Sequence, residues 1–440
     1  MLVKIIIVLY FIGVLAVGLF SWFKIKTPDD YFIAGKKAGL IPVSGSLLAT
    51  ILGGSAILGT IELSRKLGWP ALWFLFCAAI GLLLLVPLSK VVKRIGNYTL
   101  PEMLGLFYGK SAERISSFVI PVAWLGIIAA QIIAAAKILS GLEFLTYSNA
   151  AILSGIVFIF YTLAGGQLSI LKTDTLQSAI IIAGLAALLF FSKEHFPENH
   201  IQTLKSGALF NASFNGFDLL ILFLTYSVTF IVGPDIYSRL FCAKDERTAS
   251  KSVFLVAIIL IPVSFALTWL GIYSVELNDT GIMAFAAHLL PDWAYGLFIA
   301  ALLSAVMSSA DTTLLTSSMI LSELFTGNLN HSSALVQTRY LIVIIGILAI
   351  IIAIFVTSIV QSLLFALTVF SGAFVIPVLA GLLNLNVIKS RIIAAIIVGG
   401  AMALAGKIIH DYISVLAGNI IILLTYVTSS FILFLSFSRR

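Results

Sequence analysis

The segment 301–318 (ALLSAVMSSADTTLLTSS) places an acid and several hydroxyl groups inside an apolar stretch. On a helix, four of its residues fall at positions i, i+3, i+4 and i+7 and form one stripe: Ala305, Ser308, Ser309 and Thr312. Asp311 lies beside this stripe. Carboxylate, hydroxyl and carbonyl oxygens are hard ligands that suit a desolvated Na⁺. Because an acid inside a membrane is costly unless it is paired or hydrated, the segment predicts a functional cation site.

A second acid, Asp174, lies in the segment 161–179 (YTLAGGQLSILKTDTLQSA). One interpretation is that Asp174 caps the start of a helix beside Lys172, with Thr173 as a competing cap. The other is that the helix carrying segment 301–318 approaches it. Asp174 would then complete a cation site with Ser308, Asp311 and Thr312.

The elements that must hold these residues are membrane helices. Of the 440 residues, 60% are hydrophobic and only 10% are charged, far below the charged share of soluble domains. The chain divides into apolar runs that can each cross about 30 Å of hydrocarbon as a helix. Alternating strands of a membrane barrel are absent from the sequence. We predict an all-α integral membrane protein with about 13 spans, at 2–23, 40–63, 69–89, 115–142, 148–164, 174–192, 217–238, 252–275, 294–323, 338–357, 359–383, 391–408 and 413–437.

Two of these spans carry helix breakers. The second contains ATILGGSAILG (49–59) and the seventh ends in FIVGPDIYSRL (230–240). Glycine and proline at these places favour unwinding at membrane depth, although close helix packing through small residues would also explain the glycines. The two segments lie five spans apart and run in opposite directions. That spacing is typical of a five-plus-five inverted-repeat (LeuT-like) core with a central binding site.

This organisation divides the chain into five parts. The predicted parts are a first transmembrane helix and cytoplasmic loop (1–39), a first inverted repeat (40–192), an external loop (193–216), a second inverted repeat (217–385) and two C-terminal transmembrane helices (386–440).

The net charge of +7 is explained by orientation. With the N-terminus outside, 19 of the 26 basic residues, Arg239 among them, fall in cytoplasmic loops and the C-terminal tail. We therefore expect a multi-pass protein of the cell inner membrane, with an external N-terminus and a cytoplasmic C-terminus. The lipid bilayer is its expected environment, nucleic-acid binding is not expected, and no obligate protein partner is evident. Lys137, inside the fourth span, is expected to extend its side chain to the headgroups.

The sequence contains no enzyme motif. Its two cysteines and five dispersed histidines match no metal-ligand spacing, and nucleophile elbows and phosphate loops are absent. We therefore expect no enzymatic activity.

The chain resembles the sodium/solute symporter family, which includes bacterial proline, sialic acid and sugar symporters. Six segments carry this resemblance in the family's order: DDYFIAGKKAG (29–39), LLATILGGSAILG (47–59), NYTLPEMLGLFYG (97–109), YTLAGGQLSILKTDTLQ (161–177), GPDIYSRLFCAKDERTA (233–249) and AALLSAVMSSADTTLLTSS (300–318). The resemblance implies Na⁺-coupled import of a small organic solute by alternating access.

The resemblance also implies the positions of the ligands. The expected Na⁺ ligands are the carbonyls of Ala49, Leu52 and Ala305 and the hydroxyls of Ser308 and Ser309. In some members a second sodium lies at positions that match Ser308, Asp311, Thr312 and Asp174. The expected solute pocket comprises Gly53, Gly54, Ser55, Ala56, Gly233 and Asp235, with Trp73, Gln131 and Phe370 as walls or gates.

The pocket sequence favours an amino-acid-like solute such as proline. Sugar-binding relatives carry a polar run where this chain has GGSA (53–56). Backbone amides at a helix break suit a carboxylate, and Asp235 suits an ammonium group, although Asp235 could equally be a structural cap. Gln131 could be a solute ligand or a helix–helix hydrogen bond. Two alternatives stay open: a proton-coupled symporter using Asp311 or Asp174, and a symporter-like sensor module, against which the lack of a soluble signalling domain counts.

Overall fold

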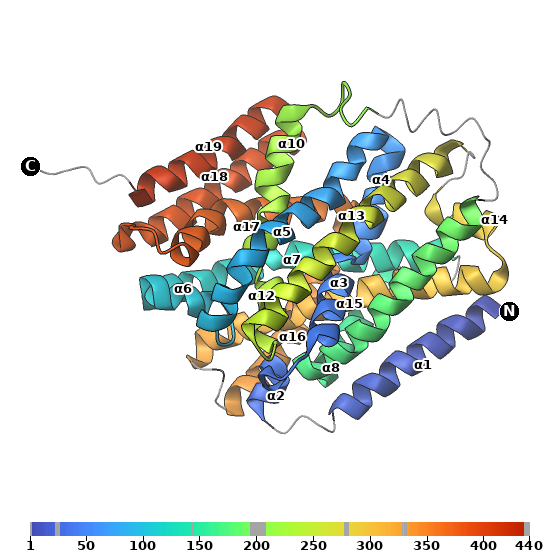
Figure 1. Cartoon of the computed structure of the whole chain (residues 1–440), viewed down its shortest axis with the longest axis horizontal. Coiled ribbons are helices and arrows are strands. Elements are labelled where there is room, and N and C mark those ends of the chain that lie inside the picture. Colours follow the sequence, from blue (N-terminus) through green and yellow to red (C-terminus); the bar gives the residue numbers. More distant parts are fainter. Residues whose placement is uncertain are drawn as a thin grey trace, which may run out of the picture.

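Helices make up the fold. The computed structural model describes residues 2–22, 27–142, 145–193, 208–276, 281–327, 329 and 332–434, and all named elements in these ranges are helical (Figure 1). In the first half these are α1 (Leu2–Trp22), α2 (Pro28–Ile33), η1 (Ala34–Lys36), α3 (Leu40–Ile51), α4 (Gly54–Leu67), η2 (Trp69–Ala71), α5 (Leu72–Ile95), α6 (Leu100–Tyr108), α7 (Lys110–Gly141) and α8 (Tyr147–Lys193).

The second half continues in the same way. Its elements are α10 (Gly216–Leu222), η3 (Phe223–Ser227), α11 (Thr229–Val232), α12 (Pro234–Cys242), α13 (Glu246–Glu276), α14 (Ile282–Leu289), α15 (Asp292–Thr326), α16 (Ser332–Phe355), α17 (Ile359–Leu382), η4 (Lys389–Arg391), α18 (Ile392–Tyr412) and α19 (Val415–Phe434). Most of the predicted external loop, 194–207, lies outside the described residues.

The prediction of an all-α membrane protein is confirmed. In the described ranges, 10 helices are long and apolar enough to cross a membrane, and the bent pair α3–α4 makes an eleventh span. Two shorter apolar helices, Leu2–Val14 and Tyr147–Leu163, coincide with further predicted spans. The count of 13 and the inverted repeat stay predictions.

Both predicted helix breaks are present. The axes of α3 and α4 differ by 43°, and the chain between them comprises Leu52 and Gly53. In the other broken segment, Gly233 is extended (φ −67°, ψ 128°) and Pro234 begins α12. Proline suits this first helical position because its missing N–H would have no helical partner there. A π-helical turn, η3, also precedes this break and was not predicted.

The helix α8 corrects one sequence-based expectation. The predicted interruption between the fifth and sixth spans is helical, and the only departure within it is a kink at Gly166 (φ +56°). A Cβ atom at Gly166 would lie 2.5 Å from the ring of Tyr31, so a side chain would be excluded there. Asp174 lies eight residues beyond this kink, well inside the helix. The interpretation of Asp174 as a helix cap is therefore wrong.

Helix α15 lies at the centre of the bundle. It packs against α8, α7, α16 and α1, and it is the most buried of the long helices in the described ranges. Helices α18 and α19 pack on each other and on α17 at one edge, whereas α1 lies at the opposite edge (Figure 1). The polar segment 301–318 is thereby enclosed by protein.

Candidate functional site

The serine pair of α15 faces the broken end of α3. The Ser308 hydroxyl donates to the Ala49 carbonyl at 2.9 Å and to the Ala305 carbonyl at 3.1 Å. The Ser309 hydroxyl donates to the carbonyl of Thr50 at 2.7 Å. Both serines are buried. Four of the five expected Na⁺ ligands therefore lie at the contact between two helices, and Thr50 joins them as a residue that the sequence did not single out.

The carbonyls on α3 are available because the helix ends there. The last carbonyls of a helix lack N–H partners from a following turn. Ala49 and Thr50 belong to the last turn of α3, and Leu52 is its buried C-cap residue with non-helical angles (φ −79°, ψ 41°). The break thus frees backbone oxygens in a dry region, where a cation or hydroxyl donor must satisfy them.

Two glycines let α15 approach this break. A Cβ atom on Gly53 would lie 2.1 Å from the Ser309 Oγ atom, and one on Gly54 would lie 2.2 Å from a methyl carbon of Val306. Any side chain at either position would push α15 away from α3 and α4. The predicted unwinding and close helix packing are therefore both present, and the second makes the serine contacts possible.

A cavity of about 60 Å³ adjoins the two breaks. Its lining includes four of the predicted pocket residues: Ser55, Ala56, Gln131 and Asp235. Gly53, Gly54 and Gly233 lie beside these residues in the chain. The remaining lining residues are Thr50, Ile51, Trp124, Ile127, Tyr226, Thr229, Phe230, Ile236, Ser309, Thr313, Leu363 and Leu367. Polar groups from the breaks thus face a largely apolar wall.

Gln131 connects this cavity to the start of α4. Its side-chain nitrogen donates to the Ser55 hydroxyl at 2.8 Å, and its oxygen accepts from the Ser55 N–H at 3.4 Å. The predicted helix–helix hydrogen bond is therefore present. Gln131 also lines the cavity.

The two aromatic wall residues chosen from the sequence do not line this cavity. The Trp73 indole donates to the carbonyl of Leu209 at 3.1 Å, and Trp73 is not among the residues that line the cavity. Phe370 is buried behind Trp124, with ring centroids 4.5 Å apart, and Trp124 forms the wall. Trp124 gave no signal in the sequence, because an aromatic residue inside an apolar span is ordinary.

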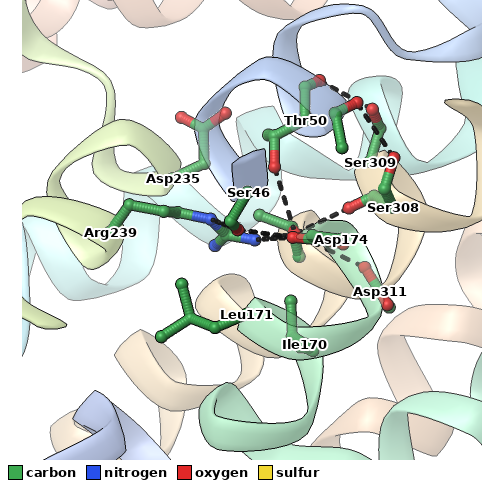
Figure 2. Close-up of polar contacts among 12 residues, drawn as sticks. Ser46, Thr50, Ile170, Leu171, Asp174, Asp235, Arg239, Ser308, Ser309 and Asp311 are labelled. Atoms are coloured by element: carbon green, nitrogen blue, oxygen red, sulfur yellow. Dashed lines mark hydrogen bonds and ion pairs between the residues drawn. The ribbon is translucent and has the colours of Figure 1, made fainter. Parts of the chain in front are cut away.

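Asp174 and Asp311 do approach the serine pair, together with an arginine (Figure 2). The Asp174 Oδ2 atom accepts from the Ser46 hydroxyl at 2.5 Å and from the Arg239 guanidinium at 3.3 Å. The guanidinium also donates to the Thr312 hydroxyl. Among the described residues, Asp311 Oδ2 and Asp174 Oδ1 are buried without a hydrogen-bond partner. Placing Arg239 in a cytoplasmic loop was wrong, because its side chain is fully buried.

Comparison with known proteins identifies the chain. The model of the sodium:solute symporter family matches residues 31–409. The chain belongs to this family. The protein is therefore a multi-pass membrane transporter and not an enzyme, and Na⁺ is its co-transported ion. The resemblance drawn from the six segments is confirmed.

Individual relatives are distant from this symporter but similar along most of their length. A sodium/proline symporter of Haemophilus influenzae is 25% identical, covering 91% of this chain and 87% of the relative. A sodium/pantothenate symporter of Escherichia coli is also 25% identical, covering 71% of this chain and 70% of the relative. Among solved structures, a Na⁺-coupled sialic acid symporter in a substrate-bound outward-open state has a TM-score of 0.80 at 17% identity, covering 98% and 97% of the two chains.

A solved structure that is more distant in sequence also shares the fold. A nucleobase-cation-symport-1 family transporter has a TM-score of 0.61 at 12% identity, covering 91% of this symporter and 93% of that chain.

Lys137 has a partner that the sequence analysis did not identify. Its ammonium group lies 2.6 Å from the Glu62 carboxylate, and each side chain is only about one third exposed (34% and 35%). The lysine thus pairs across α7 and α4, and its extension toward the headgroups stays a prediction. Because α4 carries Ser55 at its other end, this pair holds the helix that borders the cavity of the symporter.

Proposed function

We propose that this symporter imports a small amino-acid-like solute, with proline as the favoured example, together with Na⁺ by alternating access. The observation that carries the proposal is the position of the Ser308 hydroxyl, between the carbonyls of Ala49 and Ala305. These three oxygens come from the broken helix and from the central helix. Bound Na⁺ would therefore hold α3 against α15.

The expected Na⁺ ligands fit such an ion chemically. In the structure the Ser308 and Ser309 hydroxyls turn their hydrogens toward α3 carbonyls. With Na⁺ between the helices, each hydroxyl would rotate to present a lone pair. The ion would then replace two hydrogen bonds by several direct oxygen contacts. The buried setting strengthens these contacts, because water does not compete for the ion.

The cavity supports a small solute with separated charges. The cavity volume of about 60 Å³ is well below that of ordinary ligand pockets. The site must therefore widen in its solute-bound state. The N-terminus of α4 attracts a carboxylate, which would take over the Ser55 N–H that now donates to Gln131, and Asp235 in the cavity lining offers an acceptor for an ammonium group. Trp124, Tyr226 and Leu367 in the same lining suit an apolar ring or short chain.

A second cation is part of the proposal. Asp311, Thr312 and Asp174 lie beside Ser308, and two of their carboxylate oxygens are buried without a partner among the described residues. Because Arg239 already neutralises one of the two acids, one monovalent cation would balance the other. Asp311 is the carboxylate that we assign to this cation.

We also propose that the N-terminus is external and the C-terminus cytoplasmic. A membrane potential that is negative inside drives Na⁺ import, at about 2.3 kcal/mol per charge for each 100 mV. Coupling requires that solute and Na⁺ strengthen each other's binding, and the two share Thr50 and Ser309, which lie in the cavity wall and at the serine contact.

The test is solute-dependent ²²Na⁺ uptake into proteoliposomes. Proline, other amino acids, pantothenate, sialic acid and sugars would be screened with the wild type and with Ser308→Ala. We expect one amino-acid-like solute to stimulate Na⁺ uptake in the wild type, and to stimulate it much less in the variant at the same Na⁺ concentration. Stimulation by a sugar alone would overturn the solute class. Solute uptake driven by a pH gradient without Na⁺ would instead favour proton coupling through Asp311.

A further inference from the structure

Arg239 is a fully buried cation in a helix that crosses the membrane. Such charges are costly in a membrane, so they face the interior of the bundle and pair with other groups there. Arg239 belongs to α12, the helix that begins at the Gly233 break and carries Asp235 into the cavity. The arginine therefore connects the helix of the solute pocket to the groups that its guanidinium binds.

The guanidinium contacts three other helices (Figure 2). Its Nε atom donates to the Ser46 hydroxyl of α3 at 3.0 Å. One Nη atom donates to Asp174 of α8 at 3.3 Å and to the Thr312 hydroxyl of α15. The other Nη atom donates to Ser238 within α12 at 2.9 Å. One side chain thus joins the helix of the solute pocket to both helices of the serine contact.

These contacts lie on one side of the candidate Na⁺ ligands. Ser46 is one turn before Ala49 on α3, and Thr312 is one turn after Ser308 on α15. Arg239 is six residues beyond the Gly233 break. The cluster therefore lies between the serine pair and the end of the bundle where α3 begins and α12 ends.

Backbone hydrogen bonds also hold the helices together at this end of the bundle. The Ala38 N–H donates to the Cys242 carbonyl at 3.0 Å, and the Lys244 N–H donates to the Ala38 carbonyl at 2.9 Å. These bonds hold the start of α3 against the end of α12. In the proposed orientation this end faces the cytoplasm, so an ion leaving Ser308 inward would have to pass the Arg239 cluster.

We propose that Arg239, paired with Asp174, is a positioning residue that latches the inner side of the ion site. While the pair holds, α12 cannot separate from α3, α8 and α15, and the way from the Na⁺ ligands to the cytoplasm stays shut. Inward release of Na⁺ requires the pair to break. Because α12 also carries Asp235, movement of the solute helix and opening of the ion exit become one event. This inference rests on the proposed direction of transport.

A native thiol can report on this latch. Cys242 lies three residues after Arg239, is fully buried, and donates to the Ser238 carbonyl at 3.1 Å. Separation of α12 from α3 would expose it. The measurement is the rate at which a membrane-impermeant maleimide labels Cys242 from the cytoplasmic face of inside-out vesicles. A Cys77→Ser background removes the other cysteine of the chain.

We expect slow labelling in this background and about tenfold faster labelling in Arg239→Gln, because removal of one charge shifts the population toward the open state. Ser46→Ala keeps every charge and should give a smaller increase, and Arg239→Lys should partly restore slow labelling. The matched control is Arg94→Gln, which removes an exposed pair with Glu246 near the same end. Its labelling rate should not change.

A second readout separates a latch from a general structural role. Solute-independent ²²Na⁺ influx should rise in Arg239→Gln while outward-facing Na⁺ binding persists. Labelling and influx at wild-type levels in both Arg239→Gln and Ser46→Ala would overturn the latch. The labelling assay needs no knowledge of the solute, so failure to find a transported solute would refute the proposed solute class and leave the labelling result unaffected.

Discussion

The Ser308 hydroxyl lies 2.9 Å from the carbonyl oxygen of Ala49, although 259 residues separate them in the chain. The contact exists because α3 stops after Ile51 and leaves its last carbonyls free where α15 passes. The same two groups are expected to bind Na⁺. Na⁺ affinity should therefore report how closely α3 and α15 are held together.

Replacement of Ser308 by alanine should weaken Na⁺ dependence specifically. We expect the Na⁺ concentration for half-maximal uptake to rise by about tenfold or more, equivalent to about 1.4 kcal/mol. The fold should persist, because alanine fits a buried helix position. The matched control is Ser318→Ala, in which the lost hydroxyl bonds only to the Leu314 carbonyl of its own helix. Equal Na⁺ dependence in the two variants would remove Ser308 from the ion site.

Gly53→Ala should separate the two helices. The added methyl would lie 2.1 Å from the Ser309 Oγ atom, so α15 or α3 must shift. Overpacking of this kind costs about 1–3 kcal/mol. We expect a lower midpoint of thermal unfolding in detergent and a loss of Na⁺-dependent stabilisation. Gly39→Ala is the control, since a methyl there would meet no atom within 4 Å. Unchanged Na⁺ stabilisation in Gly53→Ala would show that the close approach is dispensable.

Gln131→Ala should affect the solute more than the ion. Its amide holds Ser55 at the start of α4, where the solute carboxylate is expected. Loss of one such hydrogen bond in a buried site costs about 1–3 kcal/mol, so we expect the solute KM to rise by about tenfold. The KM for Na⁺ should change much less. Gln361→Ala, near the start of α17, is the control. A larger change in Na⁺ KM than in solute KM would contradict this assignment.

The sequence predicted the parts of the site that depend on local chemistry. Helix breaks at Gly53 and Gly233 follow from what glycine and proline do to a helix, and both are present. The serine stripe follows from helical periodicity, and it does face the first break. The contribution of Thr50 was missed, because it accepts from Ser309 through its backbone carbonyl, which any residue would supply, and its hydroxyl meets Thr312 only through the packing of α3 on α15.

The sequence did not allow us to predict which helices pack against one another. Arg239 lies near the end of a span and close to Lys244, so its sequence context is that of a cytoplasmic arginine. Its burial depends on how α12 packs against three helices from distant parts of the chain. The position of Trp124 in the cavity wall has the same origin. Periodicity identifies the face of a helix, whereas its neighbours are set by the packing of the whole bundle.

The pair between Lys137 and Glu62 should contribute modestly to holding α4 against α7. The two charges lie 2.6 Å apart and are about one third exposed (34% and 35%), so solvent screens part of their attraction. We expect a coupling free energy of about 1 kcal/mol or less in a double-mutant cycle of Lys137→Met and Glu62→Gln. The exchanged pair, Lys137→Glu with Glu62→Lys, should recover most of the loss.

The measurement is the thermal midpoint of purified protein at low and high salt. Because high salt weakens a partly exposed pair, the coupling should shrink there. Purely additive effects at both salt concentrations would show that Lys137 acts through its apolar stem and not through its charge.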